Sequence, residues 1–201
     1  MTELLPIDTR LHRAKFTAAD FELLDRHGAF SAYRKTELID GEIYFVNAQH
    51  RPHGMVKMRL YDALRDALRQ ATTIYTPVCE VTLALSDADR PEPDILLTSE
   101  PDGEGCVPLS SVPLVIEVAD TTLEEDLGRK QRAYARGGVP EYWVADVKGR
   151  TIHRMWAPLF NSYEKTDTTA FGQPLTAATI PGLTIAGPPS ASRSSWIAPR
   201  S

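Results

Sequence analysis

Two carboxylates occupy positions where acidic side chains are unusual. Glu117 lies inside the apolar run Leu114-Val115-Ile116-Glu117-Val118, and Asp94 precedes the apolar residues 95–97 after two prolines. A carboxylate in a buried strand costs several kcal/mol unless it is paired or binds a cation. In isolation, Glu117 is better explained by a strand end that reaches solvent or an arginine, and Asp94 by a turn at a strand entry. If the two strands are neighbours, however, both side chains converge at one edge of the sheet.

Such a convergence would suit a divalent metal ion. Two carboxylates and a backbone carbonyl are the hard oxygen donors that Mg²⁺ and Mn²⁺ prefer. A zinc site is not expected, because the histidines and cysteines show no C-x-x-C, H-x-x-x-H or H-E-x-x-H spacing. Asp94 and Glu117 are therefore candidate ligands of Mg²⁺, with Mn²⁺ as a substitute.

Lys130 is the third residue of this set. It falls on the same helical stripe as Leu127 and Tyr134, so it is expected to face the sheet, with Arg129 and the other arginines of that helix pointing away. The alternative is a lysine whose stem packs on apolar surface while its ammonium reaches water. Asp, Glu and Lys around a divalent ion form a set that hydrolyses phosphodiesters, in which the lysine orients the attacking water or offsets the charge on the phosphorane.

The elements that must position these residues alternate between helix and strand. A short capped helix begins near Thr17, and Asp40-Gly41 predicts a tight hairpin between residues 36–39 and 42–46, because Asp-Gly supplies the positive φ values of a primed turn. Hydrophobic periodicity then predicts the rest of the core. We expect helices over 52–70 and 123–136, strands over 73–85, 95–97, 114–118, 142–147 and 151–156, and weaker strand edges within 162–175.

Two further residues are secondary candidates for the site. Glu37 lies opposite Tyr44 in the predicted hairpin, where one alternative is an exposed pair with that tyrosine. His53 lies on the inward face at a helix N-terminus, where a phosphate or a metal-bound water could meet it. A lone inward histidine is more often a hydrogen-bonded core residue.

Five segments form a recognisable set: Glu37-Leu38-Ile39-Asp40-Gly41-Glu42-Ile43, Pro91-Glu92-Pro93-Asp94, Val115-Ile116-Glu117-Val118, Asp126-Leu127-Gly128-Arg129-Lys130, and Tyr134-Ala135-Arg136-Gly137-Gly138-Val139-Pro140-Glu141-Tyr142-Trp143-Val144. Over residues 17–156 the chain resembles the Uma-two family of putative restriction endonucleases, a branch of the PD-(D/E)XK nuclease superfamily. The resemblance implies a restriction-endonuclease-like α/β core of order α-β-β-β-α-β, with a mixed sheet flanked by helices and a β-hairpin in front.

The same resemblance implies roles for individual residues. Asp94 takes the first acidic position and Glu117 the second, both as metal ligands, with the Val118 carbonyl as a third. Ala119 stands where the superfamily pattern has its lysine. Lys130 matches a lysine that has migrated to the following helix. Glu37 matches the family's hairpin acid, which implies a further carboxylate near the metal as the alternative to a pair with Tyr44.

Length and charge limit the number of domains and the classes of protein to which this chain can belong. The 201 residues suggest one domain over 1–186, followed by a flexible tail rich in proline and serine over 187–201. The net charge of −5 argues against a purely electrostatic binder of nucleic acid or membranes. No apolar run approaches the roughly 18 residues of a membrane helix, and the acidic start lacks a signal-peptide pattern, so a cytoplasmic protein is expected.

Three functions remain open on these grounds. The first is a Mg²⁺-dependent DNA endonuclease, expected to be a homodimer because two cuts in a duplex call for two sites. The second is a catalytically inactive, nuclease-like module that binds nucleic acid or a protein. The third is a hydrolase of smaller phosphodiesters, for which an acidic protein needs to neutralise few phosphates.

Overall fold

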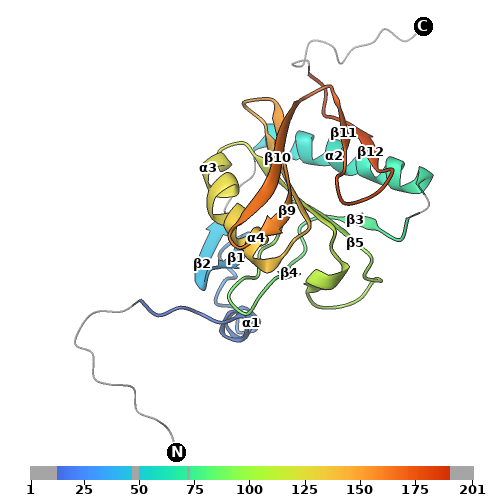
Figure 1. Cartoon of the computed structure of the whole chain (residues 1–201). Coiled ribbons are helices and arrows are strands. Elements are labelled where there is room, and N and C mark those ends of the chain that lie inside the picture. Colours follow the sequence, from blue (N-terminus) through green and yellow to red (C-terminus); the bar gives the residue numbers. More distant parts are fainter. Residues whose placement is uncertain (1–12, 47–49, 72, 191–201) are drawn as a thin grey trace, which may run out of the picture.

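A six-stranded mixed sheet forms the centre of the protein (Figure 1). The computed structural model describes residues 13–46, 50–71 and 73–190. The strands lie in the order β10-β9-β8-β7-β5-β3, with β7 and β8 parallel and the other neighbours antiparallel. Their bounds are Thr76–Val78 (β3), Ile95–Thr98 (β5), Leu114–Ala119 (β7), Glu141–Asp146 (β8), Thr151–Leu159 (β9) and Ser162–Ala170 (β10). The predicted mixed α/β core is confirmed.

Helix α2 covers one face of this sheet. It runs over Arg51–Gln70, close to the predicted range, with proline in its first turn. Leu60 and Leu64 are fully buried against the sheet and Trp143, as their spacing predicts. A small hairpin of β11 (Pro174–Thr176) and β12 (Thr184–Ala186) completes this layer.

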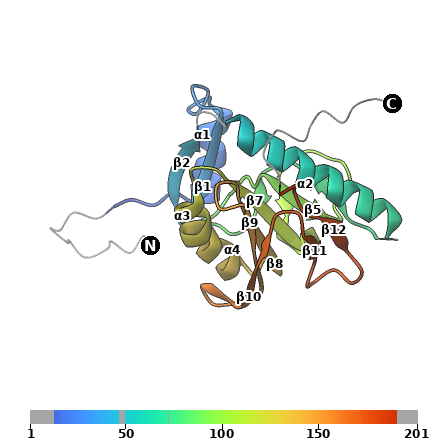
Figure 2. The same cartoon turned by 90° about the horizontal axis from the view of Figure 1, so that it is seen from above.

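The opposite face is covered by a second helical segment (Figure 2). It consists of α3 (Leu123–Glu125), a π-helical stretch η2 (Asp126–Lys130) and α4 (Gln131–Gly137). The prediction of one regular helix is wrong in this detail, because the Gln131 N–H bonds to the Asp126 carbonyl five residues back. Gly138 ends the helix in the left-handed conformation, with φ of 88°.

The N-terminal elements pack beside this second layer. Helix α1 (Ala18–Arg26) starts with a capping box between Thr17 and Asp20, and strands β1 (Lys35–Ile39) and β2 (Glu42–Val46) form the predicted hairpin. Asp40 and Gly41 have φ of 52° and 72°, which is the primed turn that the Asp-Gly pair predicts. Any side chain at position 41 would also collide with Lys15, since an added Cβ lies 2.8 Å from the Lys15 Cβ.

One predicted strand is broken in the structure. The range 73–85 contains β3, an interruption, and then β4 (Leu83–Ala84), which pairs with β6 (Val107–Pro108) before the short helix η1 (Leu109–Ser111). Glu80 adopts a positive φ of 52° and its N–H donates to the Pro93 carbonyl, so the chain turns away from the sheet there. The alternating sequence pattern gave no sign of this turn.

The C-terminal part extends the sheet further than expected. The weak signals over 162–175 correspond to the full strand β10 and to β11. Of the predicted flexible tail, Gly187 and Pro188 are hydrogen-bonded to residues 172–173, and 191–201 lie outside the described residues. Within the described ranges, no helix has the length and hydropathy of a membrane span.

Candidate active site

Asp94 and Glu117 meet where β5 enters the sheet beside β7. Ile95 pairs with Ile116 in antiparallel register, which brings the two acids together. The Val118 N–H donates to Oδ2 of Asp94 at 2.8 Å, and the Asp94 N–H donates to Oε2 of Glu117 at 3.4 Å. Both residues are buried, with 3% and 2% of their surface exposed. The predicted convergence of the two carboxylates is confirmed.

Lys130 reaches the same place from the π-helical stretch. Its Nζ lies 2.9 Å from Oε1 of Glu117 and 3.0 Å from Glu37. The hydroxyl of Tyr134 donates to the same Glu117 oxygen at 2.8 Å. The expected inward stripe of Lys130 and Tyr134 is therefore present, and the lysine amine ends in a buried ion pair instead of reaching into solvent.

Glu37 belongs to this cluster and does not pair with Tyr44. The two residues are in register across the hairpin, but the Tyr44 hydroxyl donates to Glu42. Glu37 is only 3% exposed and accepts a hydrogen bond from the Glu92 N–H at 2.8 Å. Of the two alternatives that the sequence left open for Glu37, the structure has the one inside the site.

His53 contacts Asp94 from the first turn of α2. Its Nε2 lies 3.0 Å from Oδ2 of Asp94, and the ring is buried. Because an ionised carboxylate only accepts hydrogen bonds, Nε2 must be the donor. Nδ1 has no hydrogen-bond partner within the described part of the chain. Lys57, one turn further along α2, places its Nζ 3.7 Å from Oδ1 of Asp94 and bonds Glu80 at 2.6 Å.

The two carboxylates differ in acidity because their partners differ. Burial raises the pKa of Glu117 to about 7, although the charge of Lys130 opposes this. Burial also acts to raise the pKa of Asp94, but the hydrogen bonds from His53 and the Val118 N–H, together with the charge of Lys35, outweigh it and hold the pKa of Asp94 below its ordinary value. Burial would lower the pKa of Lys130, yet Glu117 and Glu37 raise it well above the usual range. The site thus combines a firmly ionised carboxylate with one that takes up a proton near neutral pH.

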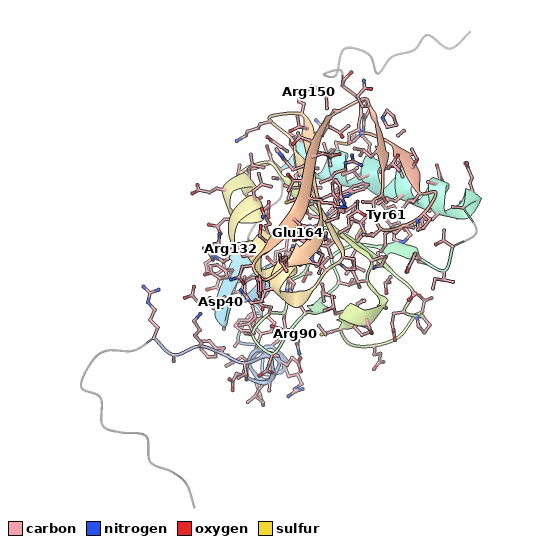
Figure 3. All side chains as sticks on the ribbon, viewed as in Figure 1. Asp40, Tyr61, Arg90, Arg132, Arg150 and Glu164 are labelled. Carbon is pink, nitrogen blue, oxygen red and sulfur yellow. The ribbon has the colours of Figure 1, made fainter. Side chains whose placement is uncertain are left out.

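These side chains lie in a pocket of about 330 Å³ between the β1–β2 hairpin, the start of α2 and the α3–η2 segment. Asp40 at the tip of the hairpin and Arg132 of α4 lie on the same side of the molecule, across from Tyr61 of α2 (Figure 3). Six acidic side chains line the pocket, against three lysines and arginines. The acids are Glu37, Asp94, Glu117, Asp120, Glu125 and Asp126, and the bases are Lys35, Arg129 and Lys130.

One of these residues corrects the sequence interpretation, and a second was missed by it. Arg129 was expected to point away, but it lines the pocket with its guanidinium 4.0 Å from the centroid of the Tyr44 ring. Asp126 is buried and accepts a hydrogen bond from the Thr122 hydroxyl at 2.6 Å. Arg129 lies within the π-helical stretch, where the ordinary helical period misplaced it. In the sequence, Gly128 within this stretch is the one signal of an irregular turn.

The donor set fits a divalent ion with few protein ligands. No group of three or more His, Cys, Asp or Glu side chains in metal-binding geometry occurs among the described residues. Mg²⁺ commonly takes one or two carboxylates and keeps several waters, so two acids and a carbonyl suit it. The excess of acids in the lining favours a cation in this pocket.

Comparison with known proteins agrees with the motifs. A family model, Uma2, described as "Putative restriction endonuclease", matches residues 18–187. The chain belongs to the Uma2 family. This confirms the resemblance drawn from the sequence, and the matched range includes every candidate site residue of this Uma2 protein.

A solved structure supports the fold of this Uma2 protein. A putative nuclease belonging to DUF820 from Anabaena variabilis ATCC 29413 has 15% sequence identity, with 71% of this chain and 80% of that chain covered at a TM-score of 0.57. No curated protein shows significant sequence similarity to it. The nuclease-like architecture is thereby shared, while the chemistry must be argued from the pocket itself.

Proposed function

We propose that this protein is a Mg²⁺-dependent endonuclease that hydrolyses DNA phosphodiester bonds. The observation that carries the proposal is the junction of Asp94, Glu117 and Lys130 in one pocket, with the lysine amine 2.9 Å from Glu117. Membership in the Uma2 family and the nuclease-like fold support the same reaction class.

In this mechanism Asp94 and Glu117 would hold a divalent ion, together with the Val118 carbonyl. When bound, a divalent ion lowers the pKa of a coordinated water and offsets charge on the phosphate. Lys130 orients the attacking water or stabilises the charge that develops as the phosphorus–oxygen bond breaks. No covalent intermediate is needed.

The surrounding residues act as positioning residues. Glu37 holds the Lys130 amine from the hairpin side, and Tyr134 fixes one oxygen of Glu117. His53 and the Val118 N–H hold Asp94 in its ionised form. Each contact limits rotation of a group that must meet the phosphate, and preorganisation of this kind is a large part of catalysis.

Plasmid nicking with Mg²⁺ or Mn²⁺ tests the proposal. We expect cleavage by the wild type and a loss of cleavage by orders of magnitude in Asp94→Asn and Glu117→Gln, which remain folded. Glu124→Gln is the matched control, because it removes an exposed acid of the same helical segment that does not line the pocket. Undiminished cleavage by either site variant would refute the assignment.

A second candidate, a non-cleaving nuclease-like binding module, is favoured by one specific observation. The Lys130 amine is already bonded to two carboxylates, and Ala119 leaves no other lysine at the superfamily position. Thermal melts distinguish the two functions. A resident divalent ion raises the melting temperature by mass action and Glu117→Gln loses that shift, whereas a binding module that has lost its metal site shows no shift at millimolar Mn²⁺.

A further inference from the structure

Two stacked aromatic rings stand exposed at the mouth of the pocket. Phe45 of β2 lines the pocket and is 52% exposed. Its ring lies 4.2 Å from that of Tyr33, which is 40% exposed, and the two planes are inclined by 25°. Large aromatic rings are normally buried, and an exposed stack beside a polar site is a surface on which another flat ring can pack.

The neighbouring wall of the pocket also presents flat side chains on which a ring can stack. Tyr44 and Arg129 both line the pocket, with the guanidinium over the ring, and Glu125 holds Arg129 at 3.1 Å. Nucleic-acid bases stack on aromatic rings and on arginine planes, and this stacking does not depend on base sequence. The hairpin side of the pocket therefore offers base-stacking groups, while the sheet side offers the reactive carboxylates.

The depth of the carboxylates limits which substrates can reach them. Asp94 and Glu117 are 3% and 2% exposed, and the pocket measures about 330 Å³. Double-stranded DNA is stiff, and bending or kinking it costs free energy. A single strand bends freely and can place one phosphate among these residues while its bases turn outward to the aromatic rings.

The charge of the pocket points in the same direction. Duplex binders gain affinity by neutralising many phosphates with lysines and arginines. Here the lining has twice as many acids as lysines and arginines, and the whole chain has a net charge of −5. Base stacking must therefore supply much of the affinity for a polyanion.

We infer that the preferred substrate is single-stranded DNA and that Phe45, supported by Tyr33, is the platform on which a base next to the scissile phosphate stacks. This inference rests on the proposed function and specifies its substrate. It predicts cleavage of single strands in preference to duplexes of the same sequence, with a shallow dependence of KM on salt.

The test compares three substrates under Mg²⁺: a single-stranded oligonucleotide, its duplex, and bis(4-nitrophenyl) phosphate, which has no base to stack. We expect kcat/KM for the single strand to exceed that for the duplex by about tenfold or more, in line with the deformation that a duplex requires. Hydrolysis of bis(4-nitrophenyl) phosphate with equal or faster cleavage of the duplex overturns the inference and leaves the phosphodiesterase intact. Hydrolysis of none of the three overturns the proposed function.

Substitutions of Phe45 provide a second test of the inference. Phe45→Ala should raise KM for the single strand by about tenfold with little change in kcat, as expected for the loss of one base–aromatic contact. Phe45→Trp should retain the wild-type KM because it keeps a stacking ring. Phe160→Ala, which removes an 84% exposed ring outside the pocket, should leave KM unchanged. An unchanged KM in Phe45→Ala, or an equal rise in Phe160→Ala, overturns the role of Phe45.

Discussion

Two buried glutamates on opposite faces of the same strand pair have different surroundings. Glu117 lies on β7 toward the helix α4 side, and Glu141 begins the adjacent strand β8 on the α2 side. Glu141 is fully buried and accepts hydrogen bonds from the Trp143 indole N–H, the Ala178 and Thr179 N–H groups and the Thr179 hydroxyl. Glu117 instead has Lys130 and a pocket beside it.

The difference shows how surroundings separate a structural carboxylate from a functional one. Around Glu141, neutral donors occupy both oxygens, and the acid ties β8 to the segment before β12. Around Glu117, burial raises the pKa to about 7, so its charge is poorly stabilised in the protein alone. A buried charge that its neighbours stabilise incompletely is suited to take up a proton or a cation.

The largest expected effect comes from Lys130, because of the two glutamates only Glu117 has a lysine as its partner. We expect Lys130→Ala to reduce Mg²⁺-dependent cleavage by about 10²–10³-fold, the usual effect of removing one stabiliser of transition-state charge. The Mn²⁺-induced shift in melting temperature should persist, because both carboxylates remain. Cleavage assays and thermal melts measure the two effects, with the exposed Arg132→Ala as control. Wild-type cleavage by Lys130→Ala would disprove the mechanism.

A rescue variant sharpens the result. Ala119 lies on the same face of β7 as Glu117 and is buried against the same apolar cluster as Tyr134. Ala119→Lys in the Lys130→Ala background would return an amine to the same side of the site. We expect partial recovery only, because a misplacement of about 1 Å can cost on the order of a hundredfold.

For stability we expect the opposite ranking: substitution of Glu141 should lower the melting temperature more than substitution of Glu117. In Glu141→Gln an amide N–H₂ replaces one acceptor oxygen against several donors, so we expect a loss of about 3 kcal/mol and a melting temperature lower by roughly 6–12 °C. Glu117→Gln should hold or raise the melting temperature in EDTA, since it removes a buried charge while Lys130 keeps Glu37 as its ion-pair partner. Differential scanning calorimetry of both variants measures this. Equal destabilisation would mean that the two sites play the same structural role.

The smallest expected effect is the dependence of stability on pH. The pKa of Glu117 rises from 4.5 to about 7 on folding, so its contribution to stability is complete below pH 4.5 and is lost as the pH rises through 7. In EDTA, the melting temperature of the wild type relative to Glu117→Gln should therefore fall by about 5 °C between pH 5 and pH 8. A constant difference between the two proteins across this range would show that the Glu117 carboxyl does not titrate there.

Local patterns were enough to predict most of the elements and the two acids. The Asp40-Gly41 turn depends on the φ values of two residues, and the buried face of α2 depends on a regular period, so both are visible along the chain. Asp94 and Glu117 stood out because charged residues flanked or interrupted apolar runs. Their convergence required one further assumption, that their strands are neighbours, and the antiparallel β5–β7 register meets it.

The sequence by itself therefore determined the sheet core, the hairpin and the identity of the acidic pair with Lys130. Only the tertiary structure decided that Lys130 joins Glu117 to Glu37, a residue 93 positions away, and that His53 bonds to Asp94 across 41 positions. It also decided that a π-turn brings Arg129 into the pocket. These contacts depend on how separate elements pack and on one irregular turn. Periodicity reports which face of an element is buried, but it does not report which distant side chain lies opposite.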